Sequence, residues 1–249
     1  MAAASLLAGC SQWRPNVVPL RTIVQPAPCA TRPDTLLVLL PGSYSLPEDF
    51  VSEGFLQAVR QRNIAADVLL VDAHLGYYEE RSIVRRLQAD IVQPARKLGY
   101  RHIWLVGISI GATGSILYAR SQPGDVDGVL LIGPFLGSRL AAKEVEIAGG
   151  LAAWRAPSQP DSGDLDLALW RWLQAQTSSA VAGRKLPLFL GYGDADRFIY
   201  NDKVLSQALP PSRVFTAKGG HDWPAWKALW PRMLDATPLP RDNSCVPVP

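Results

Sequence analysis

The sequence predicts an α/β fold, with a mainly parallel central sheet of about six or more strands flanked by helices. Three observations support this prediction. Short apolar runs recur along the chain and end at turn-forming residues, which is typical of strands buried on both faces. Segments with helical spacing of apolar residues separate these runs, as in parallel sheets. The chain has 249 residues, 48% of them hydrophobic, which is enough for a sizeable core.

The predicted elements follow one another in a regular order. An edge strand is expected at 21–25, and buried strands at 36–40, 66–72, 102–108, 128–132, 186–190 and 213–217. Helices are expected at about 48–62, 79–98, 110–121 and 223–234. Within 79–98, Ile83, Leu87 and Ile91 form an apolar helical stripe, and Pro94 should kink the helix or end its regular part.

Two parts of the chain depart from the alternation of strands and helices. Residues 1–33 are predicted to be a signal-like segment and a Pro-rich tether, which leaves 34–249 as the folded domain. Within that domain, 136–185 is rich in Trp, Pro and Gly and is predicted to be a small cap insertion. A cap at this point rises from the carboxyl edge of the sheet, where ligands bind in open α/β folds.

Composition excludes several classes of protein. Lys and Arg number 25 and Asp and Glu number 22, so the net charge of +3 does not indicate a nucleic-acid-binding protein. No apolar stretch reaches the roughly 18 residues of a membrane-spanning helix. We therefore expect a globular protein that acts on a small molecule.

The first ten residues carry a targeting pattern. Leu7-Ala8-Gly9-Cys10 resembles the lipobox of bacterial lipoproteins, which implies cleavage before Cys10 and acylation of its thiol. That interpretation predicts a membrane tether on the periplasmic side of a bacterial membrane. The stretch has no Lys or Arg and its apolar part is short, so a start further upstream or a chance match in a cytoplasmic protein are the alternatives.

The other two cysteines lie in Pro-rich segments near opposite ends of the chain. Cys29 and Cys245 are expected either to form a disulfide that ties the two ends together in an oxidising compartment or to remain unrelated thiols. The sequence has neither a CxxC nor an HxxxH pattern, so we predict no metal site and no cofactor.

The strongest catalytic signal is Gly107-Ile108-Ser109-Ile110-Gly111, which directly follows a predicted strand and opens a predicted helix. This pattern and context are typical of a nucleophile elbow, a sharp turn that exposes the Ser109 hydroxyl above the sheet. Cβ atoms at 107 and 111 would crowd that turn. Ser109 is therefore the candidate nucleophile.

A serine hydroxyl needs a base, and the chain has three histidines. His221 follows the last strand in Gly-Gly-His-Asp-Trp and is the candidate base. His74 lies at the same predicted edge of the sheet and is the alternative. His102 lies at the opposite edge, where a structural or exposed role is expected.

The third member of the triad is expected to be a carboxylate that orients the imidazole. Asp194 and Asp196 both follow the strand predicted at 186–190. Asp196 is preferred, with Asp194 as the alternative that shapes the turn through hydrogen bonds to the backbone. The chain order Ser109, Asp196, His221 is the order expected of one fold.

Together, the elbow, the acid turn GYGDADRF and the histidine loop KGGHDWPAW resemble the α/β-hydrolase superfamily over about residues 34–236, and the histidine loop resembles that of serine esterases. The resemblance implies an oxyanion hole formed by the backbone N–H of Ile110 and that of Ser43 or Tyr44. It also implies hydrolysis of carboxylic esters through an acyl-enzyme. An acyltransferase with the same triad and a non-catalytic surface binding protein are the alternatives.

Aromatic residues near the predicted site are candidates for contact with a small ester or acyl substrate. They are Tyr77, Tyr78, Phe135 and Trp223. Tyr77 and Tyr78 lie in a glycine-containing loop after the second buried strand and are the preferred pair.

Overall fold

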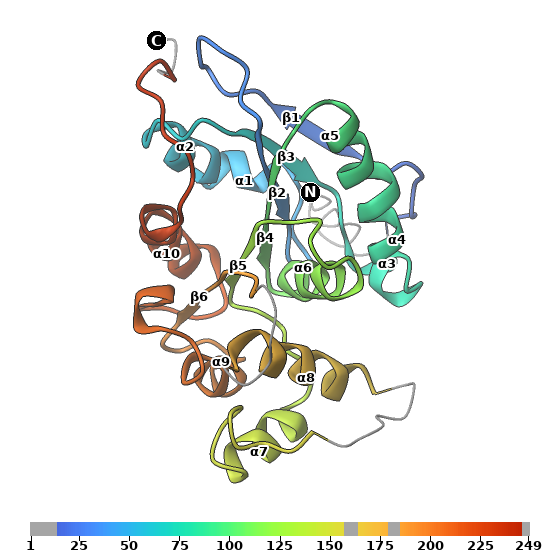
Figure 1. The fold of residues 1–249 in the computed structure, drawn as a ribbon, viewed down its shortest axis with the longest axis vertical. Coiled ribbons are helices and arrows are strands. Elements are labelled where there is room, and N and C mark those ends of the chain that lie inside the picture. Colours follow the sequence, from blue (N-terminus) through green and yellow to red (C-terminus); the bar gives the residue numbers. More distant parts are fainter. Residues whose placement is uncertain (1–13, 157–163, 179–184, 246–249) are drawn as a thin grey trace, which may run out of the picture.

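The computed structural model describes residues 14–156, 164–178 and 185–245. Its centre is a seven-stranded sheet in the order β1-β3-β2-β4-β5-β6-β7 (Figure 1). All neighbouring strands are parallel except β1, which pairs with β3 in the antiparallel direction. The strands are β1 (Thr22–Gln25), β2 (Thr35–Leu40), β3 (Asp67–Val71), β4 (His102–Ile108), β5 (Gly128–Ile132), β6 (Leu188–Gly193) and β7 (Val214–Ala217). The predicted fold class is confirmed.

Helices cover both faces of the sheet, which explains why its central strands are apolar throughout. Phe50, Phe55, Trp230 and Met233 form a core with one face, and these residues belong to α1, α2 and α10. The core on the other face includes residues of α4 to α6, α8 and α9. The helices are α1 (Asp49–Ser52), α2 (Phe55–Arg60), α3 (Leu75–Glu79), α4 (Ile83–Arg86), the π-helix η1 (Leu87–Val92), α5 (Gln93–Lys97), α6 (Ile110–Ser121), α7 (Arg139–Ile147), α8 (Leu165–Thr177), α9 (Ile199–Ser206), the 3-10 turn η2 (Pro211–Arg213) and α10 (Trp223–Ala236).

The helical predictions differ from the structure in several places. The helix expected at 48–62 is interrupted at Gly54, whose φ of 79° suits glycine alone. The helix expected at 79–98 contains the π-helix η1, and Pro94 lies two residues after it, in α5. The helix is irregular before Pro94 because proline has no N–H to donate to the regular helical hydrogen bond. Helix α9 was not predicted, although it buries Val204 and Leu205.

The described part of the predicted cap consists of α7 and α8, but α8 runs along a face of the sheet instead of rising above its carboxyl edge. Its first turn contacts the segment after β5, where Asp166 accepts the N–H of Ser138, and its last turn contacts the segment before β6, where Gln176 accepts the N–H of Leu186. Figure 1 shows α7 on the outer side of α8. Trp170 of α8 is fully buried, and its indole N–H donates to the carbonyl oxygen of Leu136 at 3.1 Å. This contact joins the cap to the segment that follows β5. Residues 157–163 and 179–184 of the predicted insertion lie outside the described residues.

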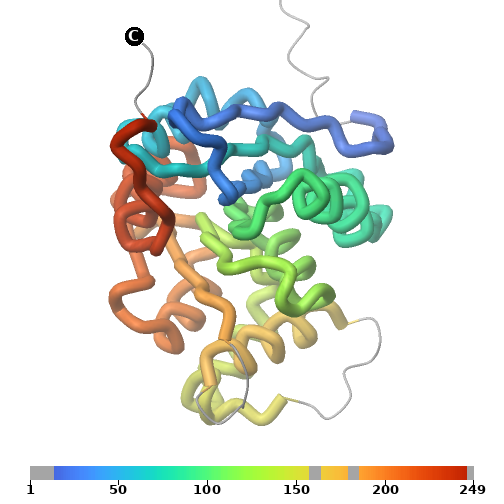
Figure 2. The backbone as a smooth tube through the Cα atoms, turned by 45° about the horizontal axis from the view of Figure 1, so that its top comes forward, coloured from blue at the N-terminus to red at the C-terminus, as the bar shows by residue number. Residues whose placement is uncertain are grey.

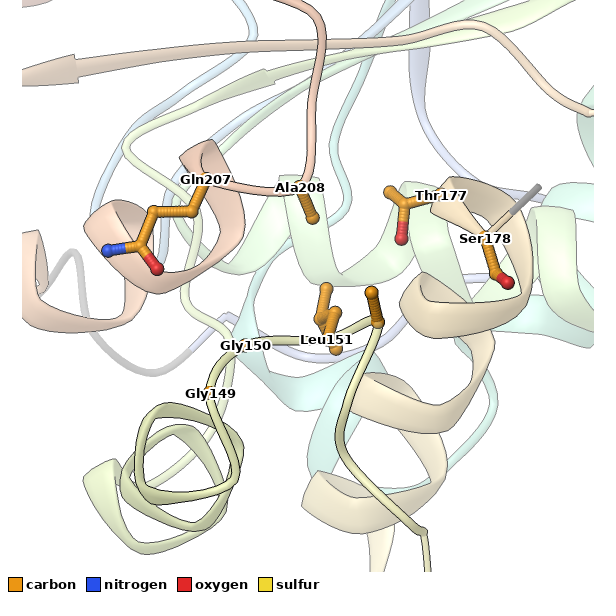
Figure 3. A pocket seen from close by; sticks show the side chains of 8 residues that line it. Gly149, Gly150, Leu151, Thr177, Ser178, Gln207 and Ala208 are labelled. Carbon is orange, nitrogen blue, oxygen red and sulfur yellow. The ribbon is translucent and has the colours of Figure 1, made fainter. Parts of the chain in front are cut away.

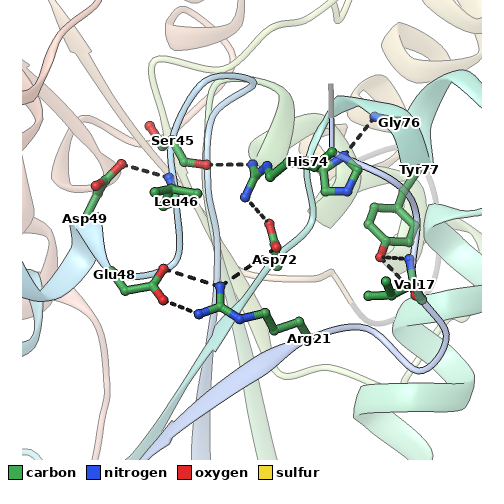
Figure 4. A network of polar contacts seen from close by, with 11 residues as sticks. Val17, Arg21, Ser45, Leu46, Glu48, Asp49, Asp72, His74, Gly76 and Tyr77 are labelled. Carbon is green, nitrogen blue, oxygen red and sulfur yellow. Dashed lines mark hydrogen bonds and ion pairs between the residues drawn. The ribbon is translucent and has the colours of Figure 1, made fainter. Parts of the chain in front are cut away.

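The amino-terminal arm is attached to the domain by polar contacts (Figure 4). Arg14 forms an ion pair with Asp72 at 2.6 Å and donates to the carbonyl oxygen of Ser45 at 3.1 Å. Tyr77 hydrogen-bonds to the backbone of Val17 at 2.9 Å. The arm therefore belongs to the folded unit from its first described residue, rather than being a free tether.

A disulfide joins Cys29 of this arm to Cys245. The blue arm and the red carboxy-terminal segment accordingly lie side by side in Figure 2. The backbone N–H of Ala30 also donates to Ser244 at 3.2 Å. Cys10 lies outside the described residues, and none of the described helices is long and apolar enough to cross a membrane.

Candidate functional site

Ser109 occupies the sharp turn between β4 and α6. Its backbone has φ 54° and ψ −117°, a conformation that residues with a side chain rarely adopt. A Cβ at Gly107 would lie 2.3 Å from the backbone nitrogen of Ala112. A Cβ at Gly111 would lie 2.3 Å from the carbonyl oxygen of Leu40. Only glycine fits at both positions, and the strained turn holds Ser109 at the carboxyl edge of the sheet.

His221 and Asp196 form a hydrogen-bonded pair at the same edge. Nδ1 of His221 lies 2.8 Å from Oδ2 and 3.0 Å from Oδ1 of Asp196. The side chain of Asp196 is 0% exposed and that of His221 is 8% exposed. The backbone N–H of Phe198 donates to Oδ1 of Asp196 at 2.8 Å and helps to orient the carboxylate. An acceptor at Nδ1 favours the neutral tautomer in which Nε2 can accept a proton.

One pocket of about 350 Å³ contains both Ser109 and His221 in its wall. The rest of the wall comes from the segment after β2, the turn after β6 and the start of α10. Its residues are Gly42, Ser43, Tyr44, Ser45, Asp49, Arg197, Asp222, Trp223 and Trp226. The structure thus brings a hydroxyl and an imidazole to one cavity, with Asp196 behind the imidazole.

Asp194 has a different environment from Asp196. Its side chain is exposed, and its Oδ1 accepts the backbone N–H of Gly219 at 3.0 Å. Its own N–H donates to the carbonyl oxygen of Ala217 at 2.8 Å. Asp194 therefore ties the turn after β6 to the loop that leads to His221, and of the two acids only Asp196 contacts the imidazole.

Three backbone N–H groups near Ser109 are candidates for an oxyanion hole. Ile110 is the first residue of α6, so its N–H has no acceptor within the helix. Among the described residues, the N–H groups of Ser43 and Tyr44 have no hydrogen-bond acceptor, and both residues line the pocket of Ser109. A Cβ at Gly42 would lie 3.6 Å from that of Ser109, so this segment passes close to the turn.

The sequence did not indicate the three residues that surround the imidazole. Phe198 and Trp226 contact the His221 ring edge-on, at centroid distances of 4.8 and 5.2 Å. A Cβ at Gly133 would lie 3.0 Å from Oδ2 of Asp196 and 3.2 Å from Nδ1 of His221. Gly133 directly follows β5, and Trp226 lies in the first turn after the histidine loop. Both positions follow the end of a strand, and this could have identified the two residues as neighbours of the imidazole.

Tyr77 and Tyr78, the preferred candidates for substrate contact, lie outside the pocket that contains Ser109. Tyr77 is 1% exposed, and its hydroxyl is bonded to the arm, so it serves to attach Val17. The hydroxyl of Tyr78 is buried against Gly114 of α6, where a Cβ on that glycine would collide with it. Neither residue lines the pocket of Ser109, which corrects the expectation for this loop. The physical reason is that helix α3 forms here and packs both rings inward.

The other two aromatic candidates lie near the triad residues. Trp223 lines the pocket and also packs edge-on against Phe50 and Phe55. Phe135 does not line the pocket, but its N–H donates to the carbonyl oxygen of Ser109 at 3.2 Å. Of the four candidates, Trp223 is thus the one in the pocket wall.

The remaining histidines do not share this pocket. His74 lines a neighbouring pocket and caps α3, where its Nδ1 accepts the N–H of Gly76 at 3.2 Å (Figure 4). Burial is the largest cause that lowers the pKa of His74, and the nearby Arg14 lowers it further. His102 is exposed at the amino end of β4.

A further pocket of about 270 Å³ lies where α7, α8 and α9 end (Figure 3). Residues of the turn after α7, the end of α8 and the end of α9 line it, and the predicted catalytic residues do not. In the parts of the chain that the structure describes, no group of three or more His, Cys, Asp or Glu side chains is arranged to hold a metal ion.

A second buried carboxyl group lies near Asp196, the candidate triad acid. Asp202 of α9 is 0% exposed, and among the described residues neither of its carboxyl oxygens has a hydrogen-bond partner. Burial raises the pKa of Asp202 to about 9, and the negative charge of Asp196 adds to the shift. Asp202 is therefore a neutral acid at neutral pH, and it does not compete with Asp196 for the imidazolium charge.

This shift predicts how stability depends on pH. The folded protein retains a proton on Asp202 that the unfolded chain releases above about pH 4, so this group lowers the free energy of unfolding as pH rises towards about 9. Asp202→Asn removes the effect. In urea unfolding between pH 5 and pH 8, we expect the free energy of unfolding of the variant to rise by about 1.4 kcal/mol per pH unit relative to that of wild type. A difference that does not change with pH would show that Asp202 is ionised in the folded protein.

The sequence matches no family model and no curated protein. Solved structures are similar at the level of the fold. S-formylglutathione hydrolase (FrmB) from Staphylococcus aureus has a TM-score of 0.56 at 14% identity, over 86% of this chain and 82% of that chain. Est1E from Butyrivibrio proteoclasticus has a TM-score of 0.57 at 17% identity, over 87% and 94%.

A third similar structure is FphF, a fluorophosphonate-binding serine hydrolase of Staphylococcus aureus. Its TM-score is 0.54 at 12% identity, over 87% of this chain and 98% of that chain. The shared features are the mostly parallel sheet, the helices on both of its faces and nearly the whole length of the chains. The chain therefore has the α/β-hydrolase fold.

Proposed function

We propose that this protein is a serine hydrolase that cleaves carboxylic esters through Ser109, His221 and Asp196. The observation that carries the proposal is the buried contact of 2.8 Å between His221 and Asp196, next to a pocket that contains Ser109 in a strained turn. The names of the similar structures, a formylglutathione hydrolase and a fluorophosphonate-binding serine hydrolase, support the same reaction class.

In the proposed mechanism, Nε2 of His221 takes the proton of Ser109 as the hydroxyl oxygen attacks the ester carbonyl. Asp196 stabilises the imidazolium that forms. The N–H of Ile110 and that of Ser43 or Tyr44 donate to the oxyanion, and each such donor is worth on the order of 3 kcal/mol. His221 then protonates the leaving alcohol and activates the water that cleaves the acyl-enzyme.

A periplasmic location with a lipid on Cys10 is part of the proposal. The disulfide between Cys29 and Cys245 supports an oxidising compartment, because such bonds are rare in the cytosol. Mass spectrometry of the mature amino terminus tests the location. An unmodified Cys10 from a lipoprotein-processing host would end this part of the proposal.

Labelling with a fluorophosphonate probe tests the catalytic proposal. We expect the wild-type protein to be labelled and Ser109→Ala not to be, because only an activated serine attacks the phosphorus atom. Ser121→Ala, an exposed serine at the other end of α6, is the matched control and should be labelled. Absence of label on the wild type would favour a non-catalytic binding protein. Transfer of the acyl group to added alcohols in preference to water would favour an acyltransferase.

A further inference from the structure

Arg197 is a cation in the wall of the candidate catalytic pocket. It follows Asp196 directly in the turn after β6, and its side chain is exposed. Its guanidinium carbon lies 4.9 Å from the centroid of the Phe198 ring, and that ring contacts His221 at 4.8 Å. The stacking on Phe198 holds the charged group near the imidazole while its N–H groups remain available.

Among the residues that the structure describes, Arg197 forms no ion pair with a carboxylate. Other arginines of the described chain do form such pairs. Arg14 pairs with Asp72 at 2.6 Å, and Arg21 pairs with Glu48. The positive charge of Arg197 is thus not neutralised by a neighbouring side chain.

The pocket also contains two carboxylates, but both are already bonded to backbone N–H groups. Oδ2 of Asp49 accepts the N–H of Leu46 at 2.8 Å. Oδ1 of Asp222 accepts the N–H of Ala225 at 3.3 Å and caps α10. Capping the start of a helix offsets part of a carboxylate's charge, whereas the charge of Arg197 has no such partner.

A second arginine lies next to the backbone of Arg197. Arg139 is the first residue of α7, and its Nη2 donates to the carbonyl oxygen of Arg197 at 3.4 Å. Its guanidinium group stacks over Tyr200 at 5.9 Å. The cap therefore places a further cation next to the backbone of Arg197.

We propose that Arg197 binds an anionic group of the substrate, so that the enzyme prefers esters that carry a carboxylate or a similar anion. This inference deepens the proposed function and rests on it for the reaction, but the binding of an anion in the pocket is testable without catalysis. Arg197 is a specificity-determining residue in this proposal, since it contacts a part of the substrate that does not react.

Binding is measured through the fluorescence of Trp223 and Trp226, which line the same pocket. Glutarate is the anionic probe and glutaramide its uncharged analogue, both at constant ionic strength. We expect glutarate to bind wild type at least about tenfold more tightly than it binds Arg197→Gln, with partial recovery in Arg197→Lys. Glutaramide should not distinguish the variants.

Arg213→Gln is the matched control. Arg213 also stacks on an aromatic ring, that of Phe189 at 5.5 Å, but it does not line the pocket. Its replacement should leave the binding of glutarate unchanged. Equal binding of glutarate to wild type and Arg197→Gln would overturn the proposal, and so would an equal loss in Arg213→Gln.

Kinetics separate this inference from the function on which it rests. The 4-nitrophenyl monoester of glutaric acid carries the charge on its acyl group, 4-acetoxybenzoate carries it on the leaving group, and 4-nitrophenyl acetate has none. In Arg197→Gln, kcat/KM for at least one charged ester should fall about tenfold further than kcat/KM for the neutral ester, mainly through KM. If wild type hydrolyses no ester, the proposed function fails, and the fluorescence experiment still decides the role of Arg197.

Discussion

His221→Ala will lower kcat for ester hydrolysis by roughly 10⁴- to 10⁶-fold and change KM little. The expected loss is large because no other imidazole lines the pocket of Ser109, and a neutral hydroxyl attacks an ester slowly. The remaining rate would come from substrate binding and the oxyanion donors. Steady-state kinetics with 4-nitrophenyl acetate measure the effect.

The two other histidines serve as controls. His102→Ala, at the opposite edge of the sheet, should leave kcat unchanged within about twofold. His74→Ala tests the alternative base, and its loss should be far smaller than that of His221→Ala, because His74 faces a neighbouring pocket. A loss of less than about tenfold in His221→Ala, with the protein still folded, would show that His221 is not the base.

Asp196→Asn is expected to lower kcat by about 10⁴-fold, whereas Asp194→Asn should lower it by less than about tenfold. The amide introduced in the first variant would keep the size of the side chain but remove the charge that stabilises the imidazolium. It would also favour the tautomer in which Nδ1 of His221 accepts rather than donates. Asp194 bonds to Gly219 and not to the imidazole, so its effect would be indirect.

The comparison of the two variants is informative because both acids lie in the same turn. Thermal unfolding of each variant controls for a loss of structure, since Asp196 is buried and Asp194 is exposed. The larger loss in Asp194→Asn would transfer the role of triad acid to that residue. Equal, small losses would show that the imidazole acts without a carboxylate.

Most of the sheet was predictable because a strand buried on both faces must be apolar throughout. The runs at 36–40 and 102–108 agree with β2 and β4 to within one residue. The strand predicted at 186–190 is shifted, since β6 begins at Leu188 and continues to Gly193. Gly191 and Gly193 suggested a turn, whereas pairing with β7 keeps them in the sheet.

The candidate site was predictable to a similar extent. A turn between a strand and a helix requires glycines at fixed offsets, so Ser109 could be identified from its neighbours alone. The sequence did not decide whether Asp194 or Asp196 contacts the imidazole, because both acids belong to one short turn. Only the folded loop before α10 determines which carboxylate the His221 ring reaches.

Tyr77 and Tyr78 illustrate the opposite case. Their position after a strand suggested contact with substrate, yet α3 turns them towards the arm and α6. Arg197 had no distinctive signal either, because an arginine in a turn usually faces solvent. Its position in the pocket depends on stacking against Phe198.

The sequence by itself determined the layered architecture, the order of the strands along the chain and the turn that presents Ser109 as the candidate nucleophile, because these follow from apolar runs and local turn geometry. The tertiary structure decided which side chains share the pocket. Asp196, His221, Gly133 and Trp226 come from three different strand ends and a helix start, and contacts between them arise only when parallel strands place those ends at one edge. Such long-range proximity is a property of packing, which no local pattern encodes.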